Sequence, residues 1–159
     1  MIWPFRRKSK KRMARIVIDE PITSSTRVSV LKALKQIEDR EFPALIVRID
    51  SPGGTVGDSQ EIYSAIKRLK DKGCKVIASF GNISASGGVY IGVASDKIVA
   101  NPGTITGSIG VIIRGNNLSE LLDKIGIKFE TVKSGVFKDI LSPDKPLSEE
   151  GRALLQGLI

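Results

Sequence analysis

Three short segments rich in glycine and serine contain the residue types that a nucleophilic catalyst needs. They are residues 51–54 (SPGG), 84–88 (SASGG) and 106–110 (TGSIG). A serine hydroxyl becomes a nucleophile when a base removes its proton, and glycine lets a backbone N–H approach a reacting oxygen closely. Covalent catalysis by a serine is one chemistry that these segments could carry. The alternative interpretation is a set of glycine-rich turns whose serines cap helices.

The absence of histidine restricts which group could act as the base. The 159 residues include no histidine and a single cysteine, Cys74. This composition excludes Ser-His-Asp and Cys-His catalysis, the usual zinc ligand and an internal disulfide. The base would be a lysine, a carboxylate, a tyrosine or water. Lys138 stands out because its apolar neighbours in residues 136–141 could desolvate its amine, although a surface lysine paired with Asp139 is the simpler interpretation.

Predicted strands and helices alternate through the first two thirds of the chain. Apolar, β-branched runs predict strands at residues 15–19, 43–49, 75–80 and 97–100, and helical spacing predicts helices at 28–40 and 58–72. This alternation predicts an α/β fold with a parallel sheet, in which strand 43–49 is covered on both faces. Sites in such sheets lie at the carboxyl ends of the strands. Segments 51–54 and 84–88 should therefore meet at one edge.

The last third of the chain has weaker patterns. We expect short strands at residues 111–113 and 127–132, a helix at 118–125, and a final helix with Ser148 as its N-cap and two acidic residues in its first turn. The chain ends at Ile159 while this helix is still amphipathic. We therefore expect a single domain over residues 14–159 that is cut short at its C-terminus.

The positive charge of the chain is concentrated in a tail, residues 1–13. The formal net charge is +8, and removing the seven basic residues of 1–15 from the total of 25 leaves 18 against 17 acidic residues. Trp3 and Phe5 beside this charge suit an anionic membrane surface. A disordered, solvated tail is the alternative, and nucleic-acid binding is less expected. The tail lacks an apolar run long enough for a signal peptide or membrane span, so we expect a peripheral membrane or cytoplasmic location.

Four blocks in order resemble the signal peptide peptidase A family of serine proteases. They are residues 51–54, 84–88, 106–111 and 134–139, and the resemblance runs from about Arg15 to the end of the chain, closest to short cyanobacterial-type members. The resemblance implies a Clp-protease/crotonase-like fold built from repeated β-β-α and βαβ units. It also implies an endopeptidase that degrades cleaved signal peptides and other membrane-associated polypeptides and forms a homo-oligomeric ring. We expect no cofactor and no metal.

The resemblance also implies a role for each of five residues. They are Ser86 as nucleophile, Lys138 as general base, Ser108 as the residue that holds the lysine, and Gly54 and Gly87 as oxyanion-hole donors. The choice of Ser86 over Ser84 comes from the resemblance, because the residues alone leave both open.

Two other functions are compatible with the residues. A crotonase-like acyl-CoA enzyme would use the same oxyanion geometry, and a non-catalytic membrane- or nucleic-acid-binding module would depend mainly on the basic tail. Labelling of Ser86 by a serine-directed acylating probe favours the protease, and tight binding of coenzyme A favours the acyl-CoA enzyme. Deletion of residues 1–12 should abolish binding by the module but spare peptide cleavage by the protease.

Overall fold

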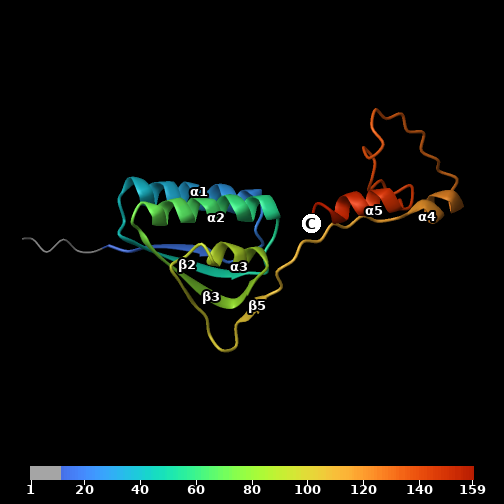
Figure 1. The fold of residues 1–159 in the computed structure, drawn as a ribbon. Coiled ribbons are helices and arrows are strands. Elements are labelled where there is room, and N and C mark those ends of the chain that lie inside the picture. The colour runs from blue at the N-terminus through green and yellow to red at the C-terminus, as the bar shows by residue number, and fades with distance from the viewer. Residues whose placement is uncertain (1–11) are drawn as a thin grey trace, which may run out of the picture. The chain divides into compact units, whose positions relative to one another are not determined.

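The computed structural model describes residues 12–159, so most of the expected basic tail lies outside the described residues. The chain divides after Gly110 into two compact units. The elements of the first unit are β1 (Ala14–Ile18), α1 (Ser24–Asp39), β2 (Ala44–Ser51), α2 (Val56–Asp71), β3 (Lys75–Ala85), α3 (Gly87–Gly92), β4 (Lys97–Val99) and β5 (Ile105–Gly107) (Figure 1).

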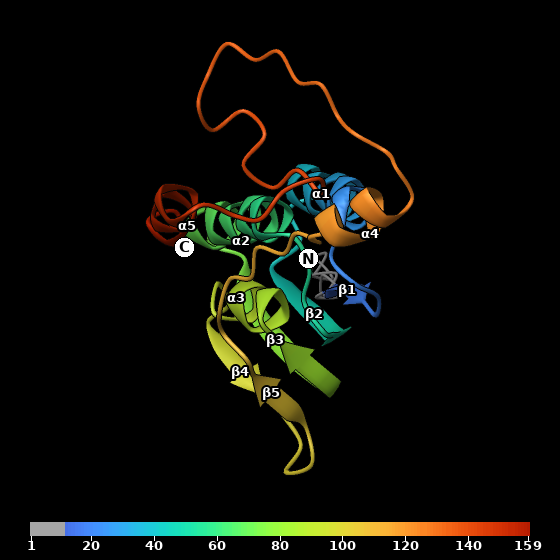
Figure 2. The ribbon, with the colours of Figure 1, turned by 90° about the vertical axis from the view of Figure 1, so that its right-hand side faces the viewer.

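The first unit is built on one parallel sheet. Its strands follow the order β1-β2-β3-β4, and β5 pairs with the carboxyl-terminal part of β3. Helices α1 and α2 make the βαβ connections and lie side by side over one face of the sheet (Figures 1 and 2). The predicted α/β class with a parallel sheet is confirmed.

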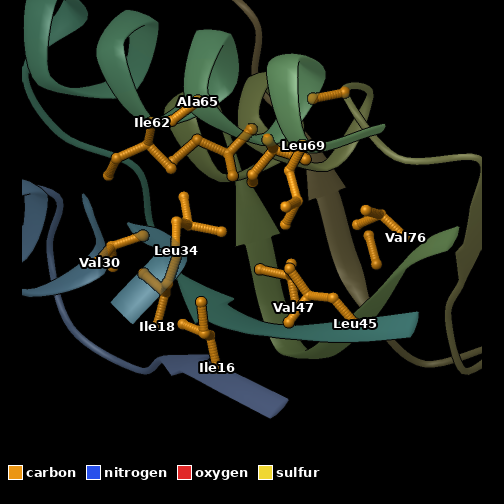
Figure 3. Packing of buried hydrophobic residues seen from close by; sticks show 14 of the residues in the cluster. Ile16, Ile18, Val30, Leu34, Leu45, Val47, Ile62, Ala65, Leu69 and Val76 are labelled. Carbon is orange, nitrogen blue, oxygen red and sulfur yellow. The ribbon is translucent and has the colours of Figure 1, made fainter. Parts of the chain in front are cut away.

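The hydrophobic core lies between that face and the two helices (Figure 3). Alternate residues of β1 are buried, among them Ile16 and Ile18, and α1 adds Val30, Leu34 and Ile37 at helical spacing. Complete burial of an aliphatic side chain of this size contributes about 1.5–3 kcal/mol. The alternation continues in β2, where every second residue is only half-buried. The expectation that this strand is covered on both faces is therefore wrong for the described residues.

Helix α1 begins at Ser24, four residues before the predicted start. The hydroxyls of Thr23 and Thr26 form a capping box that satisfies backbone N–H groups of the first turn. Arg27 then joins the two helices, because its Nε lies 2.7 Å from Asp58 Oδ1 and its Nη1 lies 3.0 Å from Glu61 Oε2. This pairing fixes how the amino-terminal ends of α1 and α2 lie beside each other.

The second unit, residues 111–159, contains α4 (Ser119–Lys124) and α5 (Glu149–Gln156). The predicted cap of the last helix is confirmed, since Ser148 Oγ accepts the N–H of Gly151 at 3.0 Å. The strands predicted at 111–113 and 127–132 are wrong. A strand needs a neighbour for its backbone groups, and this unit offers none. None of the helices in residues 12–159 is both long and apolar enough to cross a membrane.

Candidate active site

Ser86 occupies a sharp turn between β3 and α3. Its backbone has φ 49° and ψ −117°, a region that costs a residue with a side chain about 1–3 kcal/mol. Hydrogen bonds hold the turn on both sides. The Ser86 N–H donates to the Gly107 carbonyl at 2.8 Å, and the Ser86 carbonyl accepts from the Tyr90 N–H at 3.0 Å. The half-buried serine is therefore presented from a fixed backbone.

Gly53 packs directly against Ser86. A Cβ atom placed on Gly53 would lie 2.8 Å from both the Ala85 carbonyl oxygen and the Gly87 nitrogen, and 2.9 Å from Ser86 Cβ. Gly53 also has φ +97°, a conformation that side chains rarely adopt. Only glycine fits at this position without strain. The two glycine turns therefore meet at the carboxyl ends of β2 and β3, as the parallel topology predicts.

Backbone N–H donors lie on both turns. Ile22 donates its N–H to Gly53 and accepts the N–H of Thr55, and this bridge leaves the N–H of Gly54 without an acceptor among residues 12–159. Gly87 is the first residue of α3, where an N–H has no intrahelical acceptor. Gly54 is exposed and Gly87 is buried, and the role of both N–H groups as oxyanion donors stays a prediction. A short helix such as α3 adds little through its dipole, so the N–H groups themselves matter here.

Two buried serines lie behind the turn. Ser51 and Ser84 face each other in register between β2 and β3, and both are fully buried. Ser51 Oγ accepts the N–H of Gly53 at 3.2 Å, whereas Ser84 Oγ has no partner within the described residues. Of the two serines that the residues alone left open, Ser84 points into the interior, and Ser86 is the more accessible.

Ser108 directly follows β5. Gly107, at the end of that strand, pairs with Ala85, and this pairing places Ser108 beside the segment that carries Ser86. Ser108 is exposed and has a positive φ of 52°. The fold therefore brings together four of the five residues singled out, namely Gly54, Ser86, Gly87 and Ser108, within the first unit.

Lys138 belongs to the second unit. It is exposed, as the surface-lysine interpretation expects, so the expectation that its apolar neighbours desolvate it is wrong within this unit. Its backbone N–H donates to the Gly135 carbonyl at 3.2 Å. The interpretation that it pairs with Asp139 is wrong. Asp139 instead binds Lys133 Nζ at 2.7 Å and also pairs with Lys145, and these partners lower the pKa of Asp139 to about 2. Within residues 12–159 Lys138 forms no ion pair, and its pairing with Ser86 stays a prediction.

Asp50 at the end of β2 was missed by the sequence reasoning. Its Oδ1 accepts the N–H of Ile83 at 3.0 Å. Backbone N–H groups of Ile83 and Asn82, followed by the charge of Arg48, lower the pKa of Asp50. A sequence signal for it existed, since an acidic residue directly after a buried strand lies at the edge where a site is expected.

The fold and the site define an α/β protein with a parallel sheet and a strained serine at the carboxyl edge of that sheet. The model of "Peptidase family S49" matches residues 68–159. A protein of Synechocystis sp. named "Putative protease slr0021" is 60% identical over 159 residues, which are 100% of this chain and 57% of the relative. The Arabidopsis thaliana protein "Serine protease SPPA, chloroplastic" is 39% identical over 120 residues, 75% of this chain and 18% of the relative. The chain belongs to peptidase family S49.

Two solved structures of one protease resemble the α/β fold of this chain. A serine-to-alanine mutant of the 1510-N membrane-bound stomatin-specific protease aligns with a TM-score of 0.58 and 27% identity, covering 67% of this chain and 52% of that chain. A lysine-to-alanine mutant of that protease in complex with a substrate peptide aligns with the same TM-score and 28% identity, over 68% and 49%. The predicted fold class is confirmed. The chain spans about half the length, or less, of the relatives described here.

Proposed function

We propose that this chain provides the catalytic centre of a serine endopeptidase that degrades membrane-associated peptides, such as cleaved signal peptides. The observation that carries the proposal is the turn at Ser86, where a strained serine packs against Gly53 and directly precedes Gly87 at the start of α3. Membership of peptidase family S49 supports the reaction class. The substrate class follows the family resemblance and agrees with one related protease that is described as membrane-bound.

In the proposed reaction Lys138 and Ser86 act as a dyad. Lys138 Nζ, in its neutral form, takes the proton of Ser86 Oγ while Oγ attacks the carbonyl carbon of the scissile peptide bond. The oxygen of the tetrahedral intermediate accepts hydrogen bonds from the N–H groups of Gly54 and Gly87. Lys138 then protonates the leaving amine, and an ester joins the substrate to Ser86. A water molecule gives its proton to Lys138 and hydrolyses that ester, and Ser86 recovers its proton.

The remaining assignments follow from the same proposal. Ser108 holds the Lys138 amine in place, and its position directly after β5 keeps it beside the Ser86 segment. Lysine is the best candidate for the base because the chain has no histidine and because Lys138 has no carboxylate partner among residues 12–159. The related protease was solved both as a serine-to-alanine and as a lysine-to-alanine mutant, which supports the pairing of these residue types.

Assembly and location are part of the proposal. We propose a homo-oligomeric ring whose serine and lysine come either from one copy or from neighbouring copies. We also propose that residues 1–15 contact an anionic membrane surface through their basic and aromatic side chains. The enzyme would then work as a peripheral membrane or cytoplasmic protein, without a nucleic-acid partner.

Substitution of the dyad tests the proposal. Ser86→Ala and Lys138→Ala should each abolish cleavage of a fluorogenic peptide while the thermal unfolding midpoint stays unchanged. Ser64→Ala and Lys128→Ala serve as controls, because both residues lie outside the proposed site, and they should keep full activity. Full activity of Ser86→Ala would refute the dyad. A mixture of the two inactive variants regains activity if the site is shared between copies and stays inactive if each copy contains a whole site.

A second measurement separates the protease from its competitors. A fluorophosphonate probe should phosphonylate Ser86 in the parent chain, with loss of fluoride, and leave Ser86→Ala unlabelled. Coenzyme A binding without labelling would favour the acyl-CoA enzyme instead. Deletion of residues 1–12 should leave cleavage of a soluble peptide unchanged if the chain is a protease. Loss of all measurable activity in the deleted chain would favour the binding module.

A further inference from the structure

Strand β3 contains two more residues than its partner just before the site. Ile49 of β2 pairs with Phe80, and the next pair is Ser51 with Ser84, so β3 advances four residues while β2 advances two. The residues between, 81–83, form a bulge without ladder partners in β2, although Ile83 pairs with Ile105 of β5 on the other side. Bulges bend a strand and re-aim the side chains that follow. This bulge lies three residues before Ser86.

The side chain of Asp50 binds the backbone that the bulge leaves unpaired. Its Oδ1 accepts the N–H of Ile83 at 3.0 Å. Gly81 permits the contact, since a Cβ atom there would lie 2.3 Å from both Cγ and Oδ2 of Asp50. The carboxylate thus replaces the ladder hydrogen bonds, and a side chain at residue 81 would displace it.

Two further side chains hold the same stretch of β3. Arg48 Nη1 donates to the Phe80 carbonyl at 2.8 Å and to Ser79 Oγ at 3.1 Å, just before the bulge. Thr104 Oγ1 donates to the Gly81 carbonyl at 2.8 Å. The pKa of the neighbouring Asp50 is lowered chiefly by the backbone N–H of Ile83, and the charge of Arg48 contributes less. The bulge is therefore held by specific side chains of the first unit, and Asp50 binds the part of it closest to Ser86.

We infer that Asp50 is a positioning residue for Ser86, which sets the register of the end of β3 by binding the backbone N–H of Ile83 in the bulge. The register matters because it decides which residue of β3 lies opposite Ser51: with the two extra residues this is Ser84, and without them it would be Asn82. With the bulge in place, Ser84 points inward opposite Ser51, and Ser86 reaches the turn against Gly53. Without it, the segment before Ser86 would be free to shift, and the serine would lose its alignment with the N–H donors.

This inference rests on the proposed function for its kinetic consequence, but its structural part can be measured separately. Asp50→Ala removes both acceptor oxygens, and Asp50→Asn keeps one of them with nearly the same shape. Asp96→Ala is a matched control, because Asp96 Oδ2 accepts the Val76 N–H at 2.8 Å at the opposite end of the same strand. Gly81→Ala should reproduce the effect of Asp50→Ala by displacing the intact carboxylate.

The first readout is the reactivity of Ser86 in the full chain. The fluorophosphonate labelling rate constant should fall about 10- to 100-fold in Asp50→Ala, because a hydrogen bond to a charged group and the alignment of the donors are lost. Asp50→Asn should retain most of the rate, and Asp96→Ala should match the parent. In peptide cleavage, kcat should fall while KM stays the same. Equal rates for Asp50→Ala and Asp96→Ala would overturn the inference.

The second readout is amide hydrogen exchange, which requires no activity. Asp50→Ala should speed exchange at residues 82–88, whereas Asp96→Ala should speed it only near Val76. Unchanged exchange at 82–88 in Asp50→Ala would overturn the inference even if labelling were slow. If the parent and Ser86→Ala react equally with the probe, the proposed function fails, and the exchange experiment still decides the role of Asp50.

Discussion

Replacement of Gly53 by alanine tests how closely the two glycine turns must approach. The added Cβ would lie 2.8 Å from the Gly87 nitrogen and 2.9 Å from Ser86 Cβ, distances that packed atoms do not tolerate. Both neighbours are backbone or Cβ atoms, so no flexible side chain can move aside. The turn at Ser86 would have to shift, and the N–H of Gly87 would shift with it.

Two effects contribute to the expected loss of stability in Gly53→Ala, and substitutions at two other glycines allow them to be measured separately. An alanine at φ +97° costs about 1–2 kcal/mol, and overpacking adds about 1–3 kcal/mol, so Gly53→Ala should lower the free energy of unfolding by about 2–5 kcal/mol. Gly73 has φ +95° but open space around it, so Gly73→Ala should cost only the first part. Gly57→Ala, inside α2 and unobstructed, should stabilise by about 0.5–1 kcal/mol.

Urea unfolding and peptide cleavage, measured on all three variants, test these predictions. Gly53→Ala should also lower kcat by about 10²–10³-fold, the usual effect of losing one oxyanion donor, while Gly73→Ala and Gly57→Ala should keep the parental kcat. An equal loss of stability in Gly53→Ala and Gly73→Ala, with parental kcat in both, would refute the close approach of the turns. A large loss of stability without a loss of kcat would refute its role in alignment.

Two further predictions concern stability. The pKa of Asp139 is lowered to about 2 by Lys133 and Lys145, so its carboxylate stabilises the second unit above about pH 4 and this contribution is lost as the pH falls towards 2. Asp139→Asn should therefore lower the thermal unfolding midpoint at pH 7, whereas near pH 2 the variant and the parent should have the same midpoint. A difference that persists near pH 2 would contradict the coupling between protonation of Asp139 and stability. Ile66→Ala, at a fully buried position, should lower the free energy of unfolding measured in urea by about 2–5 kcal/mol. Ile77→Ala, at an exposed position, should lower it by about 1 kcal/mol. Equal losses in the two variants would rule out burial as the cause.

Much of the first unit was predictable from local patterns. The starts of β2 and β3 and the course of α2 were predicted to within a few residues, because helical spacing and apolar, β-branched runs are local properties. The cap at Ser148 was predictable for the same reason. By contrast, β3 continues to Ala85, five residues beyond its predicted end. Residues 81–85 look like a turn, and pairing with β5, the Ser51–Ser84 pair with β2 and the Asp50 side chain make them part of the strand.

The candidate site was predictable in its parts. The glycine and serine segments indicated a nucleophile and backbone N–H donors. The absence of histidine restricted the residue types that could act as the general base. The parallel topology placed two of the segments at one edge of the sheet. The contact between Gly53 and Ser86 was not predictable, because it depends on the register of β2 and β3 and on the bulge between them. The role of Asp50 depends on the same register. The pairing of Ser86 with Lys138 stays a prediction.

The sequence by itself determined the α/β class, the positions of most helices and strands, and the residue types available for catalysis, since these depend on spacing along the chain. Only the tertiary structure decided which serine faces the solvent, where β3 bends and which N–H groups are left without an acceptor. It also decided against the strands at 111–113 and 127–132, because strand pairing requires a neighbouring chain segment that no local pattern can supply. Contacts between segments distant in sequence are set by the packing of the whole sheet.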